Sequence, residues 1–156
     1  MKKVLLLIFL AVIHVIVVAQ SKSIERFRKL HKEDQNVFFY SSTIKMINSE
    51  NEPEFADLIK DIDKVMVLLY EKEKQKFKTQ EIAGLKNDLH KEKYVPLLLI
   101  NENDNTISLY KRDRKEKTVG FTALVDNKEK LVIIDVKGSI DFKKFTEFKN
   151  KIDLKL

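Results

Sequence analysis

The sequence predicts an α+β domain with a five- or six-stranded, mainly antiparallel sheet and helices packed mostly on one face. In the first half of the chain, helical and strand-like patterns alternate, which favours a layer of helices on a sheet. In the second half, successive strand patterns are joined by short polar turns, which is typical of antiparallel hairpins. Within residues 118–125 one set of alternate side chains is entirely apolar and the other is mixed, as expected for a sheet covered by helices mainly on one side.

The first half of the chain divides into segments whose helical spacing or β-branched and aromatic content sets their type. These segments are a helix at Ser23–Lys32, a strand at Asn36–Ser41, one or two helical turns at Thr43–Asn48, a helix from Asn51, a strand at Lys64–Tyr70, and a helix at Thr79–His90 that could begin near Phe77. Asn51 is expected to cap its helix, because Pro53 and Glu54 suit the first turn. The strand ending at Tyr70 is almost continuously apolar, which predicts a strand buried on both faces in the middle of the sheet.

The same spacing predicts which side chains of these helices face the core. They are Ile24, Phe27 and Leu30, then Ile44 and Ile47, then Phe55, Leu58, Ile59 and Ile62, and finally Ile82, Leu85 and Leu89. Each set places its members on one side of its helix, so that side is expected to contact the sheet.

The second half of the chain is dominated by strand patterns. The predicted strands are Tyr94–Ile100, Thr106–Lys111, Lys117–Val125 and Lys130–Val136. Gly138 is expected to end the last strand, and Asp141 to cap a final helix. The inner face of that helix would carry Phe142, Phe145 and Phe148.

Residues 1–19 have the build of a cleaved signal peptide. Lys2 and Lys3 precede an apolar run from Val4 to Ala19, and we expect cleavage between Ala19 and Gln20. An uncleaved membrane anchor is the alternative, but the apolar run is slightly short for a span. We therefore expect an exported protein, periplasmic or extracellular, that contacts the membrane only transiently through residues 1–19. Residues 20–156 are expected to form a single domain, which must depend on its core because the chain contains no cysteine.

The charge of the chain argues against nucleic acid as a partner. The formal net charge is +6, and about +4 remains without Lys2 and Lys3. Acidic residues interrupt most lysine clusters, and arginine, which is favoured in the recognition of phosphate and guanine, is scarce. A solvated surface of mixed charge is the simpler interpretation.

We find no sequence motif for catalysis, and we assign no catalytic residue. His31 and His90 lie near helix C-termini without a partner at zinc-motif spacing, so a surface or capping role is expected. Ser139 follows Gly138 outside any nucleophile elbow, and beside Asp141 it suits a helix start. A glycine-rich phosphate-binding loop is also lacking, so we assign no cofactor.

Two acidic segments could in principle bind a metal ion or transfer protons. Asn101–Asn105 has alternating oxygen ligands but lacks the glycine and the bidentate glutamate of a calcium loop, so a hairpin turn is the better interpretation, and we assign no metal site. Asp57 and Asp61 are four residues apart and, like Asp63, could act as acid and base. Their expected place on the outer face of a helix, opposite Leu58, favours solvated surface acids.

The order of several short patterns resembles one known family. These patterns are SIERFRKL, SSTIKMI, ADLIKDIDKVMVLLYE, the hairpin strands, and the closing LVIIDVKGSIDFKKF with its Gly-x-Ile-Asp-φ helix start, where φ is apolar. Taken together, they resemble the bacterial family named domain of unknown function 4252. The resemblance implies a secreted or periplasmic protein of Gram-negative bacteria, and it supplies no catalytic residue, since no activity is established for the family. Two departures are Ser139, where the family often has an acid, and the Asn-rich segment Asn101–Asn105.

The sequence therefore favours a non-enzymatic binding domain, exported to act on another protein or on a component of the cell envelope. Binding could use the less apolar sheet face or an open sheet edge, where backbone groups can accept a partner strand. The first alternative is a hydrolase-like enzyme acting on an envelope polymer through carboxylates that converge in a pocket. The second is a binder of anionic lipid or polysaccharide through lysines. The oligomeric state is left open.

Overall fold

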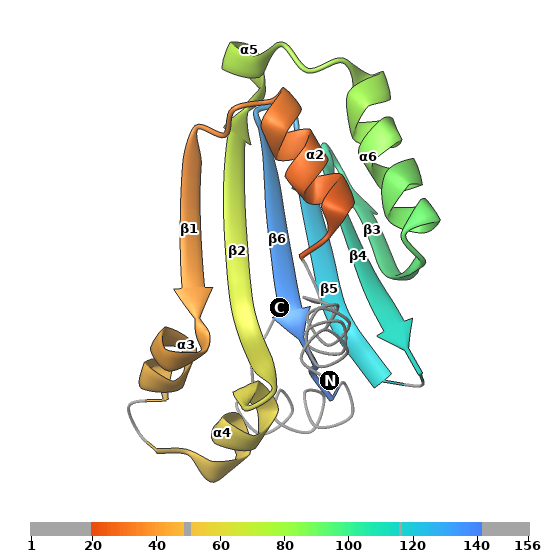
Figure 1. Ribbon diagram of the computed structural model, residues 1–156. Coiled ribbons are helices and arrows are strands. Elements are labelled where there is room, and N and C mark those ends of the chain that lie inside the picture. Colours follow the sequence, from red (N-terminus) through yellow and green to blue (C-terminus); the bar gives the residue numbers. More distant parts are fainter. Residues whose placement is uncertain (1–19, 49–50, 116, 142–156) are drawn as a thin grey trace, which may run out of the picture.

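The computed structural model describes residues 20–48, 51–115 and 117–141, and it contains a six-stranded antiparallel sheet (Figure 1). The strands are β1 (Gln35–Tyr40), β2 (Ile62–Glu71), β3 (Tyr94–Glu102), β4 (Asn105–Arg114), β5 (Lys117–Asp126) and β6 (Lys130–Gly138). Their order across the sheet is β1-β2-β6-β5-β4-β3. β1 and β3 are therefore the two edges, and the predicted α+β class is confirmed.

The longer helices lie on one face of this sheet. The helices are α2 (Lys22–Leu30), α3 (Ser41–Ile47), α4 (Pro53–Ile59), α5 (Lys72–Gln75) and α6 (Thr79–Lys91). Figure 1 shows α2 and α6 in front of the sheet, and α3 and α4 at its lower end. α5 was not predicted, because its sequence KEKQ has no apolar residue. The helix expected after Asp141, with Phe142, Phe145 and Phe148, lies outside the described residues.

The main core lies between the sheet and the pair α2 and α6. Alternate residues of the central strands point into it, as the two-residue period of a strand requires. Its members include Ile24, Phe27, Met66, Leu68, Tyr70, Ile82, Leu85, Leu89, Leu124, Leu131 and Ile133, all buried. Because each fully buried side chain of this size contributes about 1.5–3 kcal/mol, this layer supplies most of the driving force for folding.

The face of β5 that the helices cover is not its more apolar face. Gly120, Thr122 and Leu124 of the mixed set are buried, whereas in the apolar set Phe121 is buried but Ala123 and Val125 are only half-buried. Thr122 is tolerated under the helices because its hydroxyl donates a hydrogen bond to Asp135 on the neighbouring strand, at 2.7 Å. Hydrophobicity alone did not identify the covered face.

Some predicted inner-face residues are exposed. Leu30 is exposed because six residues of helix turn through about 600°, which places it about 120° away from Ile24. Ile47 is also exposed, at the last residue of the short helix α3, whereas Ile44 is buried as predicted. Ile62 is buried but belongs to β2 rather than to the preceding helix, which ends at Ile59.

The strand predicted for the middle of the sheet is second from an edge. β2 lies between β1 and β6, and its residues alternate between buried and half-buried. Its apolar residues therefore serve the two faces unequally: Met66 and Leu68 are fully buried under the helices, whereas Val67 and Leu69 are half-buried on the other face.

Asn51 does not cap α4, contrary to the prediction. It lies one position earlier than the capping residue Glu52 and has a left-handed backbone, with φ 52°. The Asn48 side chain stabilises this turn instead: it accepts from the Glu52 backbone N–H at 2.9 Å and donates to the Glu52 carbonyl at 3.0 Å. Asparagine tolerates the left-handed region better than most residues, which explains its presence at this bend.

A second, smaller apolar cluster packs at the lower end of the sheet, on the face opposite α2 and α6. It is formed by Ile44, Ile59, Ile62, Phe39, Phe55, Val65, Val136 and Ile140. α3 and α4 are thereby held against the sheet. Among the described residues, no helix has both the length and the apolar character needed to span a membrane.

Candidate functional site

The edge strand β3 exposes an unusual amount of apolar side chain. Its outer backbone edge has no neighbouring strand among the residues that the structure describes, and no charged residue occurs between Tyr94 and Asn101. Five of its apolar residues are between 39% and 60% exposed, namely Val95, Leu97, Leu98, Leu99 and Ile100, which we call the β3 strip. Edge strands of monomeric proteins are usually short or carry charges, because a free apolar edge attracts other strands.

The first half of β3 is less able to accept a strand than the second half. Its register with β4 shifts between Pro96 and Leu98, which marks a bulge. Proline lacks a backbone N–H, and both features interrupt strand pairing at an edge. The regular free edge therefore runs from Leu98 to Glu102.

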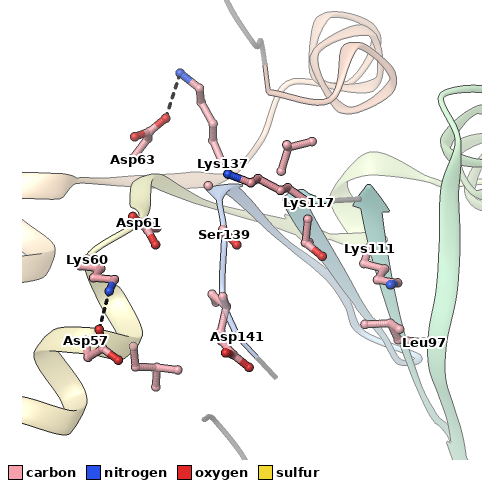
Figure 2. A pocket seen from close by; sticks show the side chains of 15 residues that line it. Asp57, Lys60, Asp61, Asp63, Leu97, Lys111, Lys117, Lys137, Ser139 and Asp141 are labelled. Atoms are coloured by element: carbon pink, nitrogen blue, oxygen red, sulfur yellow. Dashed lines mark hydrogen bonds and ion pairs between the residues drawn. The ribbon is translucent and has the colours of Figure 1, made fainter. Parts of the chain in front are cut away.

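A cavity of about 850 Å³ lies at the lower end of the sheet, beside the start of β3 (Figure 2). Leu97 of the β3 strip lines it, so the strip and the cavity are continuous. Lysines reach it from several elements: Lys60 after α4, Lys111 on β4, Lys117 at the start of β5 and Lys137 at the end of β6. The aspartates in its lining are Asp57, Asp61, Asp63 and Asp141.

The wall formed by the end of β6 depends on a glycine. Gly138 has φ 129°, and a Cβ atom there would lie 2.2 Å from the Asp61 carbonyl oxygen. The next residue, Ser139, donates its backbone N–H to the same oxygen at 2.9 Å. The segment Gly138–Asp141 thus joins β6 to the turn between α4 and β2, and it brings Ser139 and Asp141 into the cavity lining.

Most of the charged side chains of the cavity are paired. Lys60 Nζ lies 2.5 Å from Asp57 Oδ1, and this hydrogen bond raises the pKa of Lys60. Lys137 Nζ lies 3.3 Å from Asp63 Oδ2, and Lys111 Nζ lies 2.7 Å from Oδ2 of Asp113, outside the cavity. Lys117 makes no ion pair with any residue that the structure describes.

A buried carboxyl group lies elsewhere, between β6 and the start of α2. Asp135 is 1% exposed and accepts hydrogen bonds from the Thr122 hydroxyl at 2.7 Å and from the Ser21 backbone N–H at 3.3 Å. Burial raises its pKa to about 6, although these hydrogen bonds and the nearby Arg112 act in the opposite direction. Asp135 does not line the cavity, and its contacts point to a structural role.

A second carboxylate fixes the first turn of α2. Glu92 accepts hydrogen bonds from the Lys22 backbone N–H at 3.1 Å and from both the backbone N–H and the hydroxyl of Ser23. Its Oε2 atom also lies 3.6 Å from Nη1 of Arg112 on β4. The residues that follow Gln20 are thus attached to β6 by Asp135 and to the turn between α6 and β3 by Glu92.

The two histidines among the described residues, His31 and His90, are not brought together by the fold. His31 caps the C-terminus of α2, packs on Phe27 with ring centroids 4.6 Å apart, and has Nε2 3.5 Å from Glu81 Oε1. His90, in the last turn of α6, instead contacts Tyr110 edge-on at 5.8 Å. Neither residue lines the cavity.

The expected arrangement of the paired aspartates is wrong. Asp57 and Asp61 do not share the outer face of a helix, because α4 ends at Ile59 and Asp61 lies in the turn before β2. Both line the cavity, where Asp63 and Asp141 join them. The sequence contained no spacing from which this convergence could be found, since the lining comes from segments far apart in the chain.

The Asn-rich segment forms the predicted hairpin turn. β3 ends at Glu102, β4 begins at Asn105, and Asn103 has the left-handed backbone of a tight turn, with φ 51°. The Thr106 hydroxyl donates to Asn101 Oδ1 at 3.1 Å, which closes the strands above the turn. In the part of the chain that the structure describes, no group of three or more acidic, histidine or cysteine residues is placed to hold a metal ion.

A comparison with family models decides the relationship of this chain to known proteins. The model described as a domain of unknown function (DUF4252) matches residues 20–148. The chain belongs to this family. No curated protein and no solved structure matches the chain. Membership of DUF4252 confirms the resemblance found in the sequence, and the match includes the Gly138–Asp141 segment that lines the cavity.

Proposed function

We propose that the chain is an exported, non-enzymatic binding domain that captures a partner protein along the free edge of β3. Residues 1–19 direct export and are removed after Ala19, so the domain acts in the periplasm or outside the cell. The basic start, apolar run and small residues of this segment support export. The partner is a protein or a protein component of the cell envelope.

The observation that carries the proposal is the exposure of the β3 strip on a strand with an unpaired backbone edge. A peptide that adds to such an edge gains backbone hydrogen bonds and also covers apolar side chains. Covering the five side chains of the strip removes apolar surface from water at about 25 cal/mol per Å². Each of the other described elements exposes at most two large apolar side chains to this extent: Leu30 on α2, Val37 and Tyr40 on the opposite edge strand β1, and Met46 and Ile47 on α3.

The cavity supports binding better than it supports hydrolysis. Asp57 and Asp63 are engaged in ion pairs with Lys60 and Lys137, so two of its carboxylates are neutralised by neighbouring cations. A hydrolase that uses two carboxyl groups needs one of them to carry a proton for the leaving group. Asp57 and Asp63 are instead held by lysines in ion pairs, an arrangement that does not suit this role.

Capture from envelope extracts, compared between matched variants, tests the proposal. Leu98→Lys places a charge in the middle of the β3 strip, whereas Met46→Lys places the same charge at a 79% exposed position on α3. We expect photo-crosslinking to recover the same partner band with the wild type and with Met46→Lys, and to lose it with Leu98→Lys. Equal recovery by both variants, or no partner with the wild type, would contradict the proposal.

A further inference from the structure

We propose that the cavity beside β3 receives the C-terminal carboxylate of the captured partner, whose last residues pair antiparallel with β3. This inference rests on the proposed function and specifies the chemistry of its ligand, an extended peptide segment with a free carboxyl terminus. Three features support it: the direction of β3, the interruption at Pro96, and the distribution of charge in the cavity.

The direction of β3 determines which end of an added strand reaches the cavity. β3 begins beside the cavity, because Val95 pairs with Lys111 and Leu97 lines the cavity, and it runs away from there towards Glu102. All neighbouring strands of this sheet are antiparallel, and antiparallel pairing is slightly more stable per residue. An antiparallel peptide would therefore run from the Glu102 end towards Leu97, with its carboxyl end nearest the cavity.

The bulge explains why the peptide would leave the edge at this point. Regular pairing is available along Leu98–Glu102 and is interrupted at Pro96, which has no N–H to offer. A peptide paired with Leu98 would lose its hydrogen-bond partners one or two residues later. Its terminal residue is then free to turn at Leu97 onto the face where Lys111 lies.

Lys117 supplies the positive charge for a carboxylate at this end, because Lys111 is already paired with Asp113. Figure 2 shows Leu97 and Lys111 at one end of the cavity, Asp57 and Asp61 at the opposite end, and Lys117 between them. Lys117 has no ion-pair partner among the described residues, so its ammonium can pair with an incoming anion. A parallel peptide would instead bring an ammonium group to the lysine end, where like charges repel.

A defined peptide probe tests the inference on the exported protein. The probe is a fluorescein-labelled seven-residue peptide of alternating valine and threonine, made with a free C-terminal carboxylate or with a C-terminal amide. Its binding is followed by fluorescence anisotropy at low salt. We expect the carboxylate form to bind at least about tenfold more tightly than the amide, a difference of about 1.4 kcal/mol.

Variants of the protein test whether the difference in affinity between the two peptide forms arises in the cavity. Lys117→Gln should weaken binding of the carboxylate peptide to the level of the amide peptide, and it should leave binding of the amide peptide unchanged. Lys45→Gln, an exposed lysine on α3, is the matched control and should change neither. Leu98→Lys should abolish binding of both forms.

The outcomes separate this inference from the proposed function. If both peptide forms bind equally and both depend on Leu98, the carboxylate site is wrong and capture by the β3 edge stands. If binding depends on a free peptide amino terminus and on Asp61, tested with Asp61→Asn, the peptide is parallel and the inference is overturned. If neither form binds, peptide capture by β3 is overturned as well.

Discussion

The buried carboxyl group of Asp135 should make the stability of this domain depend on pH in an unusual direction. Its neighbours are the Thr122 hydroxyl and the Ser21 backbone N–H, with Arg112, Glu92 and Tyr94 also acting on it electrostatically. The perturbation is Asp135→Asn, which keeps the size of the side chain and removes its titration. The introduced amide can still accept from the Ser21 N–H and donate to the Thr122 oxygen.

The expected magnitude follows from the pKa. Burial raises the pKa of Asp135 from 3.8 to about 6, so the folded state binds this proton more tightly than the unfolded state. Its contribution to stability is therefore fully present below pH 4 and is lost as the pH rises to about 6. A shift of about two units corresponds to about 3 kcal/mol.

Urea unfolding between pH 3.5 and 7.5 measures this contribution. We expect the free energy of unfolding of Asp135→Asn, relative to the wild type, to rise by about 3 kcal/mol between pH 3.5 and pH 7.5, with most of the rise between pH 4 and pH 6.5. Asp63→Asn, at a solvent-exposed carboxylate, is the control and should follow the wild type to within about 0.5 kcal/mol. If the difference in free energy of unfolding between Asp135→Asn and the wild type did not change with pH, the assignment of a protonated buried carboxyl group would be refuted.

Two glycines and one tyrosine provide further tests by urea unfolding. Gly138→Ala should destabilise by about 2–4 kcal/mol, because it combines a disfavoured positive φ with a contact 2.2 Å from the Asp61 carbonyl oxygen. Gly84→Ala lies in the middle of α6, where no atom is within 4 Å of the new Cβ, and it should instead stabilise the domain by about 1 kcal/mol. Equal effects of the two glycine substitutions would contradict this account. Tyr70→Phe should raise the free energy of unfolding by about 1 kcal/mol, since the buried Tyr70 hydroxyl has no hydrogen-bond partner among the described residues. If the free energy of unfolding instead fell by more than about 1 kcal/mol, the hydroxyl would have a hydrogen-bond partner.

Much of the fold could be predicted from local patterns. The strands from Tyr94 onward were found from alternation and turn residues, and α6 from the spacing of Ile82, Leu85 and Leu89. These signals are strong because each element presents one apolar side to the same core, so its period is written into the sequence. The family resemblance rested on the order of these elements, and the family match bears it out.

The predictions that failed depended on contacts that local composition does not specify. The covered face of β5 could not be identified, because Thr122 becomes compatible with burial only through Asp135 on another strand. The cap of α4 was misplaced because Asn48, rather than Asn51, makes the hydrogen bonds at this turn. Local composition does not contain such pairings.

The candidate site was beyond sequence reasoning for the same reason. Lys111, Lys117 and Lys137 come from three strands, and only the sheet order brings them to one cavity. The apolar run of β3 was recognised as a strand, but its place at an edge follows from topology alone. An open sheet edge was expected as a binding surface, without any indication of which strand would provide it.

Amide hydrogen exchange of residues 20–156, with and without the free-carboxylate peptide, tests the central claim most directly. Capture along β3 predicts slowed exchange confined to Leu98–Glu102, where outward-facing N–H groups gain partners on binding. Protection centred on β1 or α6, with β3 unchanged, would contradict the claim that the free edge of β3 is the binding surface.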